Sequence, residues 1–152
     1  IETIKDSLID DVALARAVKR SGGIFLGHSG LAASIRPYPH FGDILRMISR
    51  TAFTQLRHSA LLLMLTLLGL TVVWLVPMAA VLFARGWAFA FGLAAFALSA
   101  VSYFPTLVRY GRNPMWALAL PLIALFYMAA TLSSALNFWL GRGARWKSRD
   151  YG

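Results

Sequence analysis

The chain has no cysteine among its 152 residues, and it is poor in acidic side chains. The missing thiols exclude disulfide bonds, thiol catalysis and cysteine-ligated metals, although they leave the redox compartment open. Only 14% of the residues are charged, compared with about 25% in an average soluble domain. The three histidines, His28, His40 and His58, are scattered without the spacing of metal ligands, so the sequence predicts no metal site on them.

The chain is instead rich in apolar and basic side chains. The chain is 59% hydrophobic, and its 15 Lys and Arg residues against 6 Asp and Glu give a net charge of +9. On a hydrophobic chain, excess basic charge usually marks the flanks of membrane spans, which face anionic lipid. The arginines cluster beside the apolar stretches and do not line one soluble face. We therefore expect membrane lipids as partners, and no nucleic acid.

Three apolar stretches follow residue 58, at about 60–84, 87–108 and 115–140. Each has the length of about 20 residues that a helix needs to cross a hydrocarbon core of about 30 Å. Aromatic side chains near the ends of these stretches match the belt that forms at membrane interfaces: Trp87, Tyr110, Trp116 and Trp139. The sequence predicts a transmembrane region over 59–141.

The orientation of the spans leaves two alternatives. The arginines before the first span favour a cytoplasmic N-terminal part, and an odd number of spans then puts the tail outside. The tail at 142–152, however, carries four positive charges and one negative charge, which favours the inside. Three spans with an external tail, or two spans plus a re-entrant segment with an internal tail, both fit. The length of all three stretches favours three spans.

The first 58 residues have a mixed pattern. A short amphipathic helix is expected to start at Asp10 or Asp11 and to end at Gly22-Gly23. Short strands are expected at 24–26 and 31–35. The 41–58 segment combines apolar residues with Arg46, Arg50 and Arg57, which predicts a basic amphipathic helix in the membrane interface. The alternative is that 41–58 is the water-exposed end of the first span.

The order of these features resembles a known family. An acidic pair opens a helix in "IKDSLIDDVALARAVKRSGG", and an interfacial helix follows in "SIRPYPHFGDILRMISRTAFTQLRHS". This order is similar to the C-terminal half of membrane-bound, inverting family-2 glycosyltransferases of the GT-A type. With the ending "RWKSRDYG", it resembles more narrowly the bacterial hopene-associated glycosyltransferases.

The resemblance implies a fold and a division of the chain. The fold would be mainly α, with the C-terminal piece of a GT-A α/β catalytic domain at 1–40. An interfacial helix at 41–58, about three transmembrane helices within 59–141 and a basic tail at 142–152 would follow. The chain begins at Ile1 without a visible signal peptide, and we expect it to be the C-terminal piece of a longer protein.

The resemblance also implies site residues. In the family, the second carboxylate of the acidic pair is the catalytic base, which implies Asp11, with Asp10 beside it. A Gln/Arg-x-x-Arg-Trp motif lies on the interfacial helix, and the candidates here for contacts with the donor's diphosphate are Arg46, Arg50, Gln55 and Arg57. The match departs from the motif, because Thr51 and not Trp follows Arg50, and because the Arg46–Arg50 spacing is one residue longer.

The family's Asp-x-Asp motif is absent from this sequence. A divalent metal, Mg²⁺ or Mn²⁺, is therefore expected with ligands outside these residues, and this part of the protein would be inactive alone. The expected reaction is sugar transfer, with inversion, from a nucleotide-sugar to a hopanoid, polyprenyl or other lipid acceptor. The expected location is the bacterial inner membrane. The donor sugar, the acceptor lipid and the oligomeric state stay open.

A second interpretation involves no catalysis. An acidic pair at a helix start satisfies free backbone N–H groups and the helix dipole, which is worth roughly 0.5–2 kcal/mol. Interfacial arginines often bind lipid phosphate through their long side chains. The chain would then be a basic membrane anchor or an assembly subunit of an envelope complex.

Overall fold

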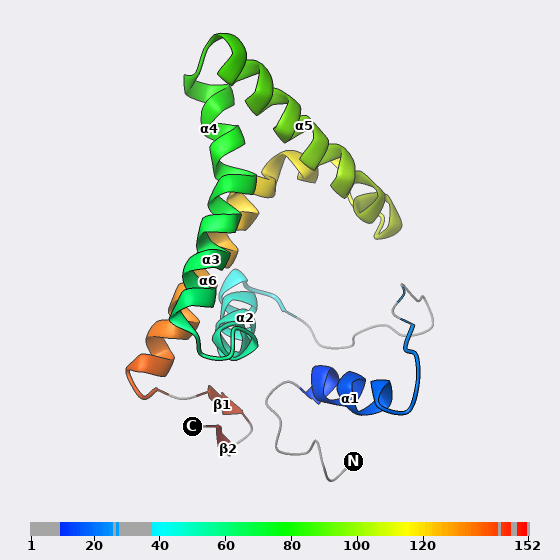
Figure 1. Cartoon of the computed structure of the whole chain (residues 1–152), viewed down its shortest axis with the longest axis vertical. Helices are drawn as coiled ribbons and strands as arrows, with labels where there is room; N and C mark the ends of the chain where they lie inside the picture. Colours follow the sequence, from blue (N-terminus) through cyan, green and yellow to red (C-terminus); the bar gives the residue numbers. More distant parts are fainter. Residues whose placement is uncertain (1–9, 26, 28–37, 143, 147–148, 152) are drawn as a thin grey trace.

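The computed structural model describes residues 10–25, 27, 38–142, 144–146 and 149–151. This part of the chain is mainly helical, as the sequence predicts. A long helical rod forms the spine, α6 packs along it, and α5 meets it at the far end and then diverges from it (Figure 1). Helix α2 packs across the other end, which we call the foot of the bundle. The C-terminal strands and α1 also lie at the foot.

The first helix, α1, covers Asp10–Lys19 and confirms the helix expected after the acidic pair. It ends before the two glycines, because Ser21 donates both its backbone N–H and its hydroxyl to the carbonyl oxygen of Val18, at 3.0 and 2.7 Å. Its apolar side chains are not buried: Leu14 is 50% exposed and Val18 is 48% exposed. The helix therefore has no core of its own among the described residues.

The strand predicted at 24–26 is wrong for its two described residues. Ile24 and Phe25 have no regular secondary structure, and the Phe25 side chain is 95% exposed. A strand is stabilised by hydrogen bonds to a neighbouring strand, and the described residues offer these two none. Leu26 and the strand expected at 31–35 lie outside the described residues. The α/β part of the expected fold thus stays a prediction.

The second helix, α2, covers Phe41–Gln55 and is separate from the first span. At its start, the backbone N–H of His40 donates to the Asp43 carboxylate at 3.2 Å. At its end, Arg57 and His58 adopt left-handed backbone angles, with φ of 53° and 54°, and turn the chain. Ser59 then caps the next helix by accepting the N–H of Leu62 at 3.3 Å. The alternative, in which 41–58 is the water-exposed end of the first span, is therefore wrong, and the predicted helix ends at Gln55 and not at residue 58.

The rod is one helical stretch from Ala60 to Phe83, made of α3 (Ala60–Leu70), the π-helical turn η2 (Thr71–Leu75) and α4 (Val76–Phe83). The π-turn precedes Pro77, whose ring would clash with a carbonyl of a regular α-helix. Widening the turn by one residue relieves that clash, and the N–H of Val76 bonds the carbonyl of Thr71. The proline is accommodated without ending the span.

The other two apolar stretches follow in order. Helix α5 covers Gly86–Arg109, and the 3₁₀ turn η3 (Pro114–Ala119) leads into α6 (Leu120–Trp139). Within the described residues there are three helical stretches long and apolar enough to cross a membrane, with mean hydropathies of 2.4, 1.7 and 1.9. Their bounds agree with the sequence prediction to within about one residue. Most large apolar side chains face outward, as lipid contact requires.

The core joins α2 to α3 and α6. Phe53 of α2 is 1% exposed and packs with Leu63 of α3 and Ala135 of α6. Its ring also meets those of Phe138 and Trp139 edge-on, with centroids 5.5 and 5.4 Å apart. Small buried side chains on one face of α6 allow α2 to approach: Ala124, Ala130, Thr131, Ser134 and Ala135. The hydroxyl of Ser134 accepts the backbone N–H of Phe53 at 3.0 Å.

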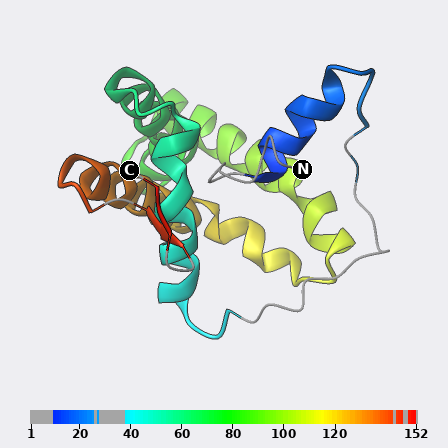
Figure 2. The same ribbon diagram turned by 90° about the horizontal axis from the view of Figure 1, so that it is seen from below.

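Figure 2 looks along the rod and shows α2 lengthwise, so α2 runs across the axis of the bundle. Past α6, β1 (Ala144–Trp146) and β2 (Arg149–Tyr151) form an antiparallel hairpin in which Arg145 pairs with Asp150. The hairpin contacts α2 through β1. The sequence predicts only a basic tail here, because strands this short have no clear alternation of apolar and polar residues.

Candidate functional site

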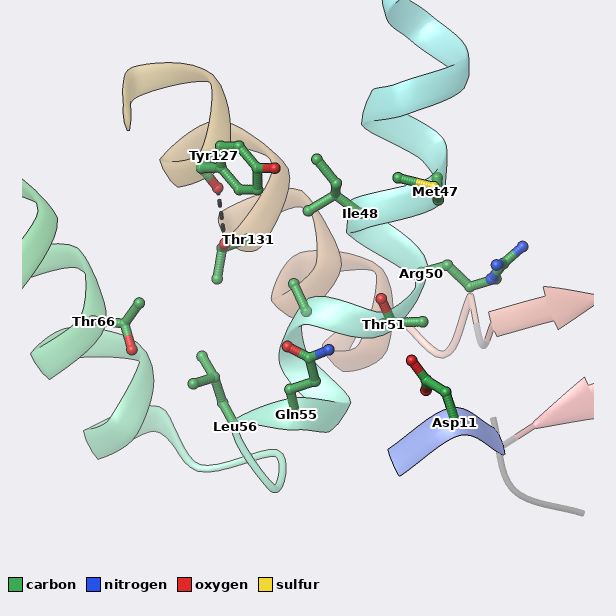
Figure 3. A pocket seen from close by; sticks show the side chains of 11 residues that line it. Asp11, Met47, Ile48, Arg50, Thr51, Gln55, Leu56, Thr66, Tyr127 and Thr131 are labelled. Atoms are coloured by element: carbon green, nitrogen blue, oxygen red, sulfur yellow. Dashed lines mark hydrogen bonds between the residues drawn. The ribbon is translucent and has the colours of Figure 1, made fainter. Parts of the chain in front are cut away.

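A pocket of about 530 Å³ opens at the foot of the bundle, where α1, α2, α3 and α6 meet. Residues from four separate parts of the sequence line it: Asp11, Met47, Ile48, Arg50, Thr51, Ala52, Gln55, Leu56, Thr66, Tyr127 and Thr131. Figure 3 shows Asp11 on the same side of the pocket as Arg50, with Thr66 across from them. The pocket therefore has a charged rim beside walls that belong to the apolar helices.

Helix α1 supplies the acidic side chain. The Asp11 side chain is exposed and points toward α2 in Figure 3, below Thr51. Its Oδ1 accepts the backbone N–H of the next residue, Val12, at 2.8 Å, and this N–H is one of those that the first turn of a helix leaves without an intrahelical partner. Asp10 is the first residue of α1, and its side chain lies outside the described part of the structure. Of the predicted acidic pair, Asp11 lines the pocket.

Helix α2 supplies the basic and amide side chains. Met47, Thr51 and Gln55 are spaced four residues apart, so an α-helix places them on one face. Arg50 lies on the same side, is half-buried and carries the positive charge of the pocket. Because α2 is locked to α6 through Phe53, this face is held over the pocket. Arg50 and Gln55, both predicted as substrate contacts, are thus brought to the same pocket as Asp11.

The other two predicted arginines do not line the pocket. Arg46 has a side chain that is 76% exposed and forms an ion pair with Asp43, one turn earlier on α2. Arg57 is exposed in the turn after α2, where its φ of 53° departs from the helix. The family-like segment therefore divides in two, with Arg50 and Gln55 facing the pocket and Arg46 and Arg57 outside it.

The hydroxyl side chains of the pocket, Thr66 and Thr131, were not predicted from the sequence. The Thr66 hydroxyl donates to the Leu62 carbonyl oxygen, and the Thr131 hydroxyl to the Tyr127 carbonyl oxygen, each at 2.8 Å. Because each hydroxyl proton is already donated to a backbone carbonyl, each hydroxyl oxygen still has a lone pair that can accept a hydrogen bond from a ligand hydroxyl. The available signal was the spacing of Tyr127, Thr131 and Ser134, which puts polar groups on one face of an otherwise apolar helix.

The pocket places charged and polar side chains beside apolar side chains. A carboxylate can accept a proton, and an arginine can bind phosphate oxygens through two N–H groups. Met47, Ile48 and Leu56 offer apolar contact within the same pocket. Among the described residues, no group of three or more His, Cys, Asp or Glu side chains could hold a metal ion. The pocket fits an amphipathic ligand with a hydroxyl or phosphate head group.

The comparisons with known proteins add no relative. No family model matches the chain, and neither the search of curated proteins nor that of solved structures returned a match. The family resemblance accordingly stays a prediction.

Proposed function

We propose that this chain is the C-terminal, acceptor-side part of a membrane glycosyltransferase that transfers a sugar from a nucleotide-sugar to a lipid with inversion. One observation supports the proposal above the others. Asp11, Arg50 and Gln55 were singled out by a family resemblance, and all three line one pocket at the foot of the apolar helices. Asp11 and Arg50 are 39 positions apart in the sequence, so no local pattern brings them together.

In the proposed reaction, the acceptor lipid lies along α3 and α6 with its hydroxyl at the rim of the pocket. The hydroxyl oxygen attacks the anomeric carbon of the sugar, and its proton passes to the Asp11 carboxylate. The bond from the anomeric carbon to the diphosphate breaks, and the nucleoside diphosphate leaves with the electron pair. Arg50 offsets the negative charge on the leaving diphosphate, and Gln55 donates a hydrogen bond to it.

The donor half of the reaction needs groups that the pocket does not supply. The divalent metal that the resemblance implies finds no fitting ligand cluster among the described residues. Asp11 is the acidic side chain in the pocket lining, and we assign it to the proton and not to a metal. No step of the proposal runs through a metal bound by these residues.

The setting of the proposed enzyme is the bacterial inner membrane, with α2 on the cytoplasmic side. Three helical stretches long and apolar enough to span a membrane support a multi-pass membrane protein. The arginines at the foot favour the cytoplasmic side under the positive-inside rule. The direction of α2 across the bundle axis suits a helix that lies in the interface.

The decisive experiment replaces Asp11 by Asn in the full gene product that contains this chain. Release of nucleoside diphosphate from a panel of nucleotide-sugars is measured in membranes that supply the lipid acceptor. Loss of a general base lowers turnover by about 10²–10⁴-fold. The control is Asp43→Asn, which removes an equal charge from α2 outside the pocket and leaves turnover within a few-fold. Full turnover in D11N, with normal expression, contradicts the assignment.

A basic membrane anchor is the second candidate, and one observation favours it. The bond from the Val12 N–H to the Asp11 carboxylate is what a purely structural acidic residue at a helix start would make. The coding sequence upstream of Ile1 distinguishes the two candidate functions. An Asp-x-Asp after a strand there supports the enzyme, whereas an unrelated upstream segment supports the anchor.

A further inference from the structure

The two ends of the apolar region meet at the foot of the bundle. His58, just before α3 begins, stacks on Phe138, near the end of α6, with ring centroids 4.2 Å apart and an interplanar angle of 11°. Phe53 of α2 reaches Trp139, the last residue of α6, at 5.4 Å. The start of the first apolar helix and the end of the last one therefore lie side by side, and α6 runs antiparallel to α3.

The middle helix runs in the same sense as α6. Helix α5 turns back directly after α4, and Gly92 lies against Pro77 and Ala80, so that a Cβ there would come within 2.5 Å of the Ala80 Cβ. Helix α4 packs with α5, whereas α6 packs with α3 and η2 (Figure 1). The rod thus runs away from the foot, and α5 and α6 return in series. This return path brings the C-terminal hairpin back beside α2, which it contacts.

The positive charges divide unequally under this arrangement. Residues 41–152 contain ten Lys and Arg, and seven of them belong to α2, the turn after it and the tail. Of the other three, Arg85 lies at the far end of the rod, whereas Arg109 and Arg112 belong to the end of α5 and the turn after it, on the return path toward the foot (Figure 1). Three full crossings would instead divide the ten charges five and five, because the tail would move to the side of Arg85. The positive-inside rule favours the arrangement that puts seven of the ten charges at the foot and Arg85 alone at the far end.

We infer that the chain enters and leaves the membrane on the same side, so that α2 and the C-terminal hairpin form one cationic surface on the anionic phospholipid head groups of a single leaflet. This selects two spans plus a re-entrant segment with an internal tail, over the three spans with an external tail that the lengths of the apolar stretches favour. Lys and Arg side chains near an anionic leaflet are attracted to its head groups, and salt screens this attraction. The inference rests on helix direction and charge, and it does not depend on the proposed enzymatic function.

Single-cysteine variants test this directly, because these 152 residues contain no cysteine, and the unsubstituted gene product labelled in parallel gives the background. Arg46→Cys reports on α2, Arg142→Cys on the end of α6, and Arg85→Cys on the turn between α4 and α5. All three positions are exposed. Cells are treated with a membrane-impermeant maleimide before and after permeabilisation. We expect R46C and R142C to label only after permeabilisation, and R85C to label before it.

Labelling of R142C from the same side as R85C, or of all three variants from one side, overturns the inference. A protease-protection assay on the otherwise unsubstituted protein with a C-terminal epitope tag guards against variants that misfold. In sealed right-side-out spheroplasts the tag is expected to stay protected. Its digestion there, with α2 on the inside, would also overturn the inference.

The lipid contact is tested with the purified protein in vesicles. A polarity-sensitive fluorophore is attached to Ser148→Cys in the tail or to Arg46→Cys on α2. Adding phosphatidylglycerol to phosphatidylcholine vesicles should shift the emission of both labels to the blue, and high salt should reverse the shift. A response from the α2 label alone, or from neither, contradicts a shared lipid surface.

Discussion

Replacing Phe53 by Ala should detach α2 from the apolar helices and dismantle the pocket. The Phe53 side chain is 1% exposed and fills the space between α2, Leu63 of α3 and Ala135 of α6. Its ring also meets those of His58, Phe138 and Trp139 with centroids 5.4–5.5 Å apart. Losing a buried phenyl group costs about 3–5 kcal/mol, from lost contacts and from the cavity left behind. We expect a loss of that size in the free energy of unfolding.

The measurement is reversible unfolding of the purified protein in mixed micelles by SDS, followed by circular dichroism. The matched control is Phe41→Ala, on the same helix, because the Phe41 side chain is 78% exposed and meets only the edge of Phe126 among the ring contacts of the described residues. A single aromatic pair of that kind is worth about 0.5–1.5 kcal/mol. Equal losses in the two variants would refute the role of Phe53 as the residue that locks α2 in place.

Three smaller predictions follow from individual contacts. Ser134→Ala removes the acceptor of the Phe53 N–H and should cost about 0.5–1.5 kcal/mol in the same unfolding assay. Gly92→Ala should overpack the contact between α4 and α5 and cost about 1–3 kcal/mol. Gly69→Ala, where an added Cβ meets nothing within 4 Å, should cost nothing, and a loss equal to that of Gly92→Ala would contradict the packing argument. Under the proposed function, Arg50→Gln should raise the KM for the nucleotide-sugar in steady-state assays by about tenfold or more. The reason is that a charge-assisted hydrogen bond is worth about 1.5–3 kcal/mol. An unchanged KM would show that Arg50 does not belong to the donor site.

The apolar helices could be predicted from the sequence because their signal is local. A span needs about 20 consecutive apolar residues to cross the hydrocarbon core, whatever the rest of the chain does. The stretch at 60–84 therefore matched the rod from Ala60 to Phe83. Helix α1 was predictable for the same reason, because carboxylates at its start and basic residues near its end act within one turn.

The sequence predictions failed where contacts between separate segments decide the secondary structure. Ile24 and Phe25 have the apolar character of a strand, but a strand also needs a neighbour, and the described residues supply none. The hairpin of β1 and β2 went unpredicted because each strand has three residues, too few to display a period of two. The π-turn before Pro77 was not predicted either, because a proline inside a span can be accommodated by a kink as well as by a widened turn.

The sequence by itself determined that this is a membrane protein with three apolar helices, a basic amphipathic helix before them and an acidic residue at the start of α1. Those properties depend on residues within a few turns of one another. Only the tertiary structure decided that α2 lies on α6 and that the end of α6 returns to the start of α3. It also decided that Arg50 and Gln55 line the same pocket as Asp11, whereas Arg46 lies outside it. The physical reason is packing: Phe53 and the small residues of α6 fit together across 81 positions of sequence, a distance over which no periodic pattern carries information.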